Sequence, residues 1–357
     1  MGYFVTVLVY REVGPAEYVW FAAYWATLFL VIGTLSGVEQ ELARGTKKAK
    51  SSDPQLSSPS AQFALGLAGL VIAVTITTST FWATPLLGYQ GQLLIWPFSL
   101  GAAGFVIVAA LGGTLYGLSK WNLLALMISL DAIIRVSFLA IALLFTDDLV
   151  VLAWCVSIPF PLTIAVLWPM LKKAIHRQTE VDVTLGKLTW NVARTVVASG
   201  SSALIITGFP MLIAFASQGR DLIFTGQLIL ALTLLRAPLT VVAVSLQSFL
   251  VVKFRDQRSS GAKIMVSIQI GLILVTLVLA WIGLGFGPAL LSALSDDVSL
   301  ITGEIVALTI VSSGLLAMMI VLAASLLAQG NHFFYSLGWL FSALATVLII
   351  LGPGELT

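Results

Sequence analysis

Apolar residues run through this sequence in long stretches, each about as long as a membrane is thick. Ten such stretches, of about 20 residues or more, are separated by shorter polar segments. In hydrocarbon a segment must satisfy its own backbone hydrogen bonds, so stretches of this length predict transmembrane α-helices. The predicted spans are residues 19–38, 63–87, 93–117, 123–145, 149–171, 192–215, 222–252, 264–286, 305–327 and 333–351.

A shorter apolar stretch, residues 3–10, precedes the first of these spans. At about 1.5 Å of rise per residue it reaches less than half of the hydrocarbon core. It lacks the basic beginning and the small-residue cleavage site of a signal peptide. We therefore interpret it as the exit half of a truncated first helix, and we expect a last helix to be missing after residue 351.

Composition and rare residues agree with this interpretation. Of the 357 residues, 59% are apolar and 10% are charged, whereas about a quarter of the residues of a soluble domain are charged. The chain cannot cover a water-facing surface, so its solvent is lipid. The single cysteine, Cys155, excludes an intrachain disulfide. The two histidines, His176 and His332, are far apart, and no metal site is predicted.

The placement of lysine and arginine predicts the orientation in the membrane. Alternate loops hold thirteen basic residues, and the other set of loops holds only Arg11 and Arg220. Because cytoplasmic loops carry the excess of basic residues, the first set is predicted to face the cytoplasm. Its members are Arg44, Lys47, Lys48, Lys50, Lys120, Lys172, Lys173, Arg177, Lys187, Lys253, Arg255, Arg258 and Lys263.

The two halves of the chain begin alike. Each has an outward helix, a short outer loop with an arginine, an inward helix and a basic loop. This pattern predicts a same-sense repeat about an axis along the membrane normal. We expect an N-terminal lobe at residues 1–171, a cytoplasmic inter-lobe loop at 172–190 and a C-terminal lobe at 191–357. The predicted fold is an all-α, polytopic membrane helix bundle with two pseudo-symmetric lobes, ten full spans and the truncated first helix.

The beginning of the chain carries a recognisable motif. The sequence VYREVGPAEYVWFAAYW is followed by a helix and then by GVEQELARG, and LLRAPLT and LLAQGNHFF occur further along. These segments resemble the polysaccharide exporters, or Wzx-type O-antigen flippases, of the multidrug/oligosaccharidyl-lipid/polysaccharide superfamily. A valine, Val19, stands where the family usually has glycine. The positions that match the first motif include Arg11, Gly14, Pro15, Tyr18 and Arg44.

The resemblance implies a flippase. Such a protein moves a polyprenyl-diphosphate-linked oligosaccharide across the cytoplasmic membrane by alternating access, during polysaccharide synthesis for the cell envelope. The implied partners are this lipid-linked substrate, the bilayer and envelope polysaccharide assembly proteins, and no nucleic acid. No cofactor and no enzymatic activity are expected. A proton or sodium gradient, or the membrane potential, would drive transport, since the sequence has no GxxxxGK[ST] loop for ATP.

Two charged residues within one predicted span are candidates for the transport site. Asp131 and Arg135 are four residues apart, so they lie on one face of the helix. Charged groups at bilayer depth cost about 2.5–3.5 kcal/mol or more, which makes them functional candidates. In one interpretation they form a self-neutralising ion pair that fixes helix packing. In the other, Arg135 lines a central cavity, and Asp131 tunes it or carries a coupling proton or cation.

Arg236 is the second candidate for binding substrate. It lies near the middle of a long span, has no carboxylate within a helical turn in sequence, and precedes Pro238. A guanidinium binds phosphate oxygens through two parallel hydrogen bonds, so a diphosphate is a suitable ligand. Arg194 lies within a turn of the cytoplasmic end of its span, so we expect its side chain to snorkel to the interface.

Two alternative functions remain open at this stage. The chain could be a drug or small-solute exporter of the same superfamily, or a membrane scaffold that transports nothing. A flippase requires a basic cavity, whereas a drug exporter requires an apolar cavity with a carboxylate. Kinks are expected at 157–161, Pro97 and 208–210, and Gly33 and Gly37 are expected to pack within the molecule.

Overall fold

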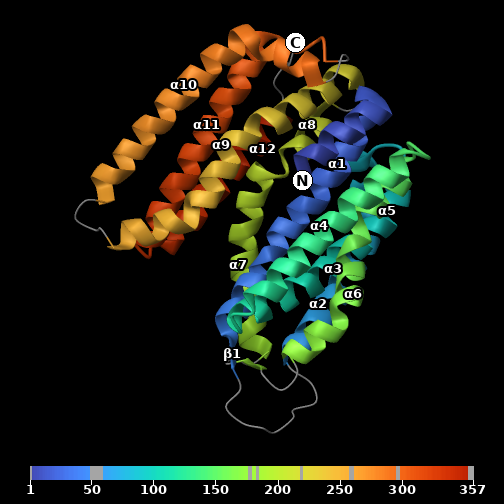
Figure 1. The fold of residues 1–357 in the computed structure, drawn as a ribbon, viewed down its shortest axis with the longest axis vertical. Helices are drawn as coiled ribbons and strands as arrows, with labels where there is room; N and C mark the ends of the chain where they lie inside the picture. Colours follow the sequence, from blue (N-terminus) through green and yellow to red (C-terminus); the bar gives the residue numbers. More distant parts are fainter. Residues whose placement is uncertain are drawn as a thin grey trace. The chain divides into compact units, whose positions relative to one another are not determined.

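The computed structural model describes residues 2–48, 59–175, 179–181, 185–217, 220–256, 261–294 and 298–352, and these residues are mostly helical (Figure 1). The helices are α1 (Gly2–Gly45), α2 (Pro59–Leu87), α3 (Gly91–Gly117), α4 (Trp121–Leu143), α5 (Leu149–Ser157), α6 (Pro159–Ile175), α7 (Leu185–Ile206), α8 (Phe209–Ser217), α9 (Leu222–Asp256), α10 (Gly261–Leu294), α11 (Gly303–Ala328) and α12 (His332–Leu351). Two three-residue strands, β1 (Thr46–Lys48) and β2 (Thr179–Val181), complete the set of described elements.

The described helices confirm a polytopic membrane bundle. Nine spans are long and apolar enough to cross a membrane, and there are ten if α7 and α8, which are bent by 64°, count as one. Helices α5 and α6 together form one span. Breaks occur at the predicted kinks, between Ser157 and Pro159 and between Ile206 and Phe209. Pro97, by contrast, lies inside α3, which continues through it.

Helix α1 consists of two helices that meet at Gly14. The φ of +77° and ψ of 168° at Gly14 are not helical, and the positive φ favours glycine. The side chains of Thr6 and Tyr18 lie near each other, although a straight helix would separate these residues by about 18 Å. The rings of Tyr10 and Tyr18 also meet edge to face, with centroids 5.1 Å apart. The chain therefore reverses its direction at Gly14, where the sequence predicts a loop between an outward and an inward helix.

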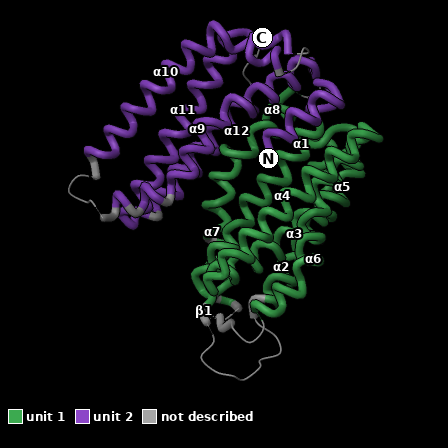
Figure 2. The backbone as a smooth tube through the Cα atoms, in the orientation of Figure 1, with its two compact units in different colours: residues 1, 20–218 green, residues 2–19, 219–357 purple. Residues whose placement is uncertain are grey.

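The contacts divide the chain into two compact units (Figure 2). Unit 1 contains residues 20–218, and unit 2 contains residues 2–19 and 219–357. The first segment of α1 thus belongs to unit 2, while the rest of α1 belongs to unit 1 together with α7 and α8. The predicted lobes, residues 1–171 and 191–357, have different limits from these compact units. The division into lobes stays a prediction.

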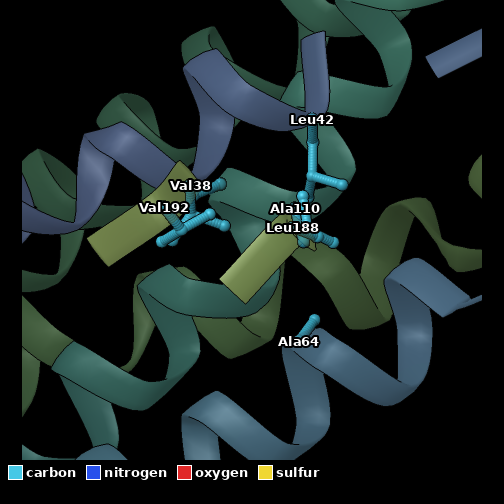
Figure 3. Close-up of a cluster of buried hydrophobic side chains, with 7 residues drawn as sticks. Val38, Leu42, Ala64, Ala110, Leu188 and Val192 are labelled. Atoms are coloured by element: carbon cyan, nitrogen blue, oxygen red, sulfur yellow. The ribbon is translucent and has the colours of Figure 1, made fainter. Parts of the chain in front are cut away.

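In unit 1, small residues bring α7 against α1. A Cβ atom added to Gly33 would lie 2.7 Å from the Cβ of Ala203, and one added to Gly37 would lie 3.1 Å from the backbone nitrogen of Val196. This confirms that these two glycines pack within the molecule. Beside them lies a cluster of buried apolar side chains from α1, α2, α3 and α7 (Figure 3), whose members are Val38, Leu42, Ala64, Ala109, Ala110, Leu188 and Val192.

Three basic loops of unit 1 lie at one end of that unit. Strands β1 and β2 pair antiparallel, with Thr46 opposite Val181, so the segments after α1 and after α6 are adjacent. A Cβ on Gly117, just before Lys120, would lie 2.7 Å from the Cβ of Thr46. The predicted orientation requires this grouping of the loops. That this end faces the cytoplasm stays a prediction.

Unit 2 is built around α9 and α11, which pack along each other, and α10 packs on α11. At one end of α9 and α11, Leu250, Phe254, Val321 and Ala324 form a buried apolar cluster. Close contacts between α10 and α11 also use glycine, since a Cβ on Gly314 would lie 2.2 Å from the hydroxyl oxygen of Thr276. Helix α10 exposes large apolar side chains along much of its length, as a lipid-facing helix does.

Candidate functional site

The two charged residues of α4 form an ion pair inside unit 1. The Arg135 Nη2 donates a hydrogen bond to the Asp131 Oδ2 over 2.5 Å, across the predicted spacing of four residues. The side chain of Arg135 is only 7% exposed, and that of Asp131 is 20% exposed. The pair is therefore largely removed from solvent, and each charge offsets the desolvation cost of the other.

Arg135 also binds the backbone at the break between α5 and α6. Its Nη1 donates to the Val156 carbonyl over 2.5 Å. Pro159 and Pro161 have no N–H group to offer the carbonyls of Cys155 and Ser157, so helix hydrogen bonding is interrupted on both sides of Val156. The guanidinium lies over the ring of Phe160, 4.3 Å from its centroid, and near Phe29 at 5.5 Å. From α4, Arg135 thus contacts three other helices, α1, α5 and α6.

A hydroxyl pair extends this polar layer. The hydroxyl oxygens of Tyr24 and Ser157 are 2.7 Å apart, and the Tyr24 hydroxyl also donates to the Ala153 carbonyl over 3.3 Å. Gly101 of α3 leaves room for them, since a Cβ there would lie 2.7 Å from the Ser157 Oγ. The sequence indicated the proline break but gave no signal for Tyr24 or for Phe29. Their partners are more than a hundred residues away.

One oxygen of Asp131 is available for further chemistry. The Oδ1 is buried and has no hydrogen-bond partner among the residues that the structure describes. A carboxylate oxygen with unused lone pairs can accept a proton or a hydrogen bond. The pair can therefore fix the packing of α4 against α5 and α6, and its free carboxylate oxygen keeps the coupling interpretation open.

Arg236 lies in unit 2, near the middle of α9, and is half-buried. Helix α9 runs through Pro238. The Thr240 hydroxyl donates to the Arg236 carbonyl over 2.6 Å. Tyr3 lies near Thr240 and Arg236. The sequence did not predict that Tyr3 lies here, because the contact depends on the reversal of the chain at Gly14.

The VGPAEY segment at the start of the chain forms a turn that packs on α9. Backbone atoms of Pro15 lie so close to Gly226 that a Cβ there would be 1.9 Å from the Pro15 carbonyl oxygen. Tyr18 is fully buried, and its side chain lies near those of Thr233 and Thr6. The motif residues Gly14, Pro15 and Tyr18 therefore attach the first segment of α1 to unit 2.

The two motif arginines have different surroundings. Arg11 is exposed. Arg44 donates to Glu41 over 2.8 Å, but its own side chain is 71% exposed. Glu41 is mostly buried and also accepts a hydrogen bond from the Thr195 hydroxyl over 3.0 Å, which links α1 to α7. The ion pair of Arg44 with Glu41 thus lies at the C-terminal end of α1.

The predicted substrate arginines are not brought together within one unit. Arg135 belongs to unit 1 and Arg236 to unit 2. The side chain of Arg194 and the residue His176 lie outside the described parts, so the snorkelling of Arg194 stays a prediction. Among the described residues, no three His, Cys, Asp or Glu side chains gather as metal ligands would.

Comparison with known proteins shows the fold. No protein-family model matches the chain. Two uncharacterised proteins of Mycobacterium tuberculosis strain H37Rv are each 28% identical to it, over 98% and 99% of this chain and 82% of their own length. An uncharacterised protein of Mycobacterium bovis is also 28% identical, over 99% of this chain and 82% of its own length.

A solved structure is similar along nearly the whole chain. It is the inward-facing conformation of a multidrug resistance MATE family transporter of the MOP superfamily, the multidrug/oligosaccharidyl-lipid/polysaccharide superfamily. The TM-score is 0.57, the sequence identity is 13%, and the match covers 98% of this chain and 83% of the transporter. The chain therefore has the membrane helix fold of that transporter.

Proposed function

We propose that this chain is a membrane transporter that moves a lipid-linked oligosaccharide across the cytoplasmic membrane by alternating access. The observation that carries the proposal is the fold, which 98% of the chain shares with a transporter of the MOP superfamily. The division of the chain into two compact units supports it, because alternating access requires two bodies that can exchange their contacts. Envelope polysaccharide assembly proteins would be its functional partners.

The substrate class follows from Arg236 and from the flippase-like motifs. A polyprenyl-diphosphate-linked saccharide has an apolar tail, which can stay in lipid, and a diphosphate, which needs a cation at bilayer depth. Arg236 is half-buried in an apolar helix, and its planar guanidinium suits two phosphate oxygens at once. Tyr3 lies near this side chain, and the Thr240 hydroxyl donates to the backbone carbonyl of Arg236.

Arg135 and Asp131 have a different part in this proposal. The Asp131 carboxylate offsets the Arg135 charge, and the Val156 carbonyl takes a second guanidinium nitrogen. Arg135 would have to exchange these partners before it bound a diphosphate. We therefore assign the first contact with substrate to Arg236, and we assign Arg135 with Asp131 to the packing of unit 1.

A drug or small-solute exporter is the second candidate. It is favoured by the similar solved structure, which is that of a multidrug resistance transporter. The Asp131 oxygen without a described partner also fits this candidate, since an exporter of cationic drugs needs a carboxylate at bilayer depth. Drug susceptibility of cells that express the chain separates the two candidates.

Complementation of a flippase-deficient strain tests the proposed function. We expect the wild-type chain to restore surface polysaccharide and Arg236→Ala to abolish it at normal protein abundance. Arg236→Lys should rescue in part, because it keeps the charge and loses the paired hydrogen bonds. Arg220→Ala is the matched control, because Arg220 is exposed just before α9. Full complementation by Arg236→Ala would contradict the proposal, as would drug resistance without restored polysaccharide.

A further inference from the structure

The ends of three helices of unit 1 meet around one buried apolar cluster. Helix α3 ends there, α4 begins there, and the last turn of α6 lies beside them. The buried members of the cluster are Leu115, Leu124, Met127, Leu167 and Leu171. Because Leu115, Leu124 and Leu171 come from these three ends, the residues within a turn of them lie at the same end of unit 1.

Three exposed lysines lie at this end. Lys120 is the N-cap residue of α4, and Lys172 and Lys173 are in the last turn of α6. Within the described part of the chain, none of the three forms an ion pair, whereas Arg44 and Arg135 each do. The three ammonium groups are therefore open to a ligand from outside the protein.

Negative charge is scarce around these lysines. Helices α3 and α6 contain no acidic residue. In α4 the acidic residue is Asp131, which is about 16 Å along the helix from Lys120 and is paired with Arg135. Glu39 of α1 lies against Gly112, more than a helical turn before α3 ends. The three helix ends thus carry a positive charge that no carboxylate of α3, α4 or α6 offsets.

Exposed aromatic side chains indicate that this end lies at the depth of the lipid headgroups. Trp121 directly follows Lys120 and is exposed, and its ring meets that of Tyr116 edge to face, with centroids 5.5 Å apart. Trp168 is also exposed and lies four residues before Lys172, on the same face of α6. Trp and Tyr gather at membrane interfaces, where one part of the ring is apolar and the other is wet. Lysines at this depth extend toward the phosphate groups of the lipid.

We propose that Lys120, Lys172 and Lys173 bind the headgroup of an anionic phospholipid of the surrounding bilayer, such as phosphatidylglycerol. An ammonium group is a compact charge on a flexible stem, so it can follow a phosphate without a fixed geometry. Each lysine near an anionic lipid surface strengthens the attraction about fivefold. This inference goes beyond the proposed function, because the lipid bound here is not the one transported.

The surfaces of α4 and α6 next to the lysines suit the acyl chains of the same lipid. Large apolar side chains are exposed there, and they are Leu126, Ile128, Val166 and Met170. They follow Lys120 along α4 and precede Lys172 along α6, so they lie deeper in the bilayer than the lysines. Headgroup and acyl chains of one phospholipid therefore each meet side chains of matching chemistry.

Binding of two phospholipids to the purified full chain in a non-ionic detergent tests this surface. The probes are palmitoyl-oleoyl phosphatidylglycerol, which is anionic, and palmitoyl-oleoyl phosphatidylcholine, which has the same acyl chains and no net charge. We expect the wild type to prefer phosphatidylglycerol. The combined variant Lys120→Gln, Lys172→Gln and Lys173→Gln should bind it about 10- to 100-fold more weakly. Its dissociation constant for phosphatidylcholine should not change.

Two control variants separate charge from structure. Replacement of the same three lysines by arginine keeps the charges and should keep the preference. Lys263→Gln removes an exposed lysine from the first turn of α10, in unit 2, and should also keep it. The unfolding midpoint without added lipid should be the same for the glutamine variant and the wild type, because the lysines are exposed.

Farnesyl diphosphate, a diphosphate on an isoprenoid tail, distinguishes a bilayer lipid from the proposed transport substrate. A selective loss of phosphatidylglycerol in the glutamine variant, with farnesyl diphosphate no tighter a ligand than phosphatidylglycerol, supports the inference. An unchanged preference in the folded glutamine variant overturns it. Tighter binding of farnesyl diphosphate that depends on the same lysines also overturns it, because the lysines would then serve the substrate. Arg236→Ala should keep the preference, so failure of this inference leaves the proposed function standing.

Discussion

At the scale of single residues, the ion pair in α4 gives the clearest prediction for stability. Arg135→Ala leaves Asp131 as a lone charge in a mostly buried site and removes the donor to Val156. We expect it to lower the free energy of unfolding in detergent by about 3 kcal/mol. The double change of Asp131 and Arg135 to Ala should recover part of this loss, because no lone charge remains.

The exposed pair at the end of α1 is the control for this prediction. Arg44 binds Glu41 at a similar distance, but its side chain is 71% exposed. Surface pairs contribute about 1 kcal/mol or less, so Arg44→Ala should change the unfolding midpoint little. If Arg135→Ala unfolds at the same temperature as Arg44→Ala, the α4 pair does not stabilise unit 1.

Asp131 also allows a test of energy coupling. Asp131→Asn is nearly isosteric and removes the titratable group, whose Oδ1 has no described partner. We expect this variant to transport with the same dependence on an imposed ion gradient as the wild type, because we assign the residue to packing. Transport by Asp131→Asn that no longer responds to the gradient, in a protein of normal stability, would give Asp131 the coupling role.

The sequence alone predicts one of these side-chain contacts but not the others. The Asp131–Arg135 contact could be predicted, because a spacing of four residues places two side chains on one helix face wherever that helix lies. The contacts of Arg135 with Val156 and of Tyr3 with Thr240 could not. They join distant segments, and nothing in the local pattern of either segment specifies its partner.

At the scale of elements, the docking of the α1 turn on α9 predicts that Gly226 cannot be replaced. A methyl group there would overlap the Pro15 carbonyl oxygen, which is backbone and cannot rotate away. We expect Gly226→Ala to lower the free energy of unfolding by about 1–3 kcal/mol. Gly271→Ala in α10 is the control, since nothing lies within 4 Å of a Cβ there. Equal unfolding midpoints for the two variants would contradict the docking contact.

The helices themselves were the most predictable part of the fold. Apolar length is a local property, so nearly every span was located from sequence, and prolines and a glycine marked the breaks at Ser157–Pro159 and near Gly208. The pairing of β1 with β2 was not predicted. Each strand has three residues and pairs with a segment more than 130 residues away, so neither has a recognisable pattern of its own.

At the scale of the whole molecule, the distribution of basic residues predicts the topology. Single cysteines at Lys47 or Lys172, in a chain with Cys155 replaced by alanine, should not react with an impermeant thiol reagent in intact cells. A cysteine at Asp147 should react, because its loop is at the opposite end of unit 1 from β1 and is predicted to face out. Labelling of Lys47→Cys from outside would reverse the predicted orientation.

The division into two lobes, with limits at 171 and 191, stays a prediction from the similar beginnings of the two halves. The contacts group the residues differently, into compact units with limits at 19–20 and 218–219. The difference arises because α7 packs on α1 through Gly33, Gly37 and Ala203. Small residues that allow close packing are common in membrane helices, so they do not show in advance which helix will be the partner.

Transport in proteoliposomes tests the central claim most directly. Polyprenyl-diphosphate-linked oligosaccharide is placed in the outer leaflet, and a glycosidase added outside digests whatever has not crossed. With the wild-type chain, we predict that the protected fraction rises with time, that Arg220→Ala behaves in the same way, and that Arg236→Ala stays at the level of protein-free liposomes. A folded wild-type chain that protects no more substrate than protein-free liposomes would contradict the account.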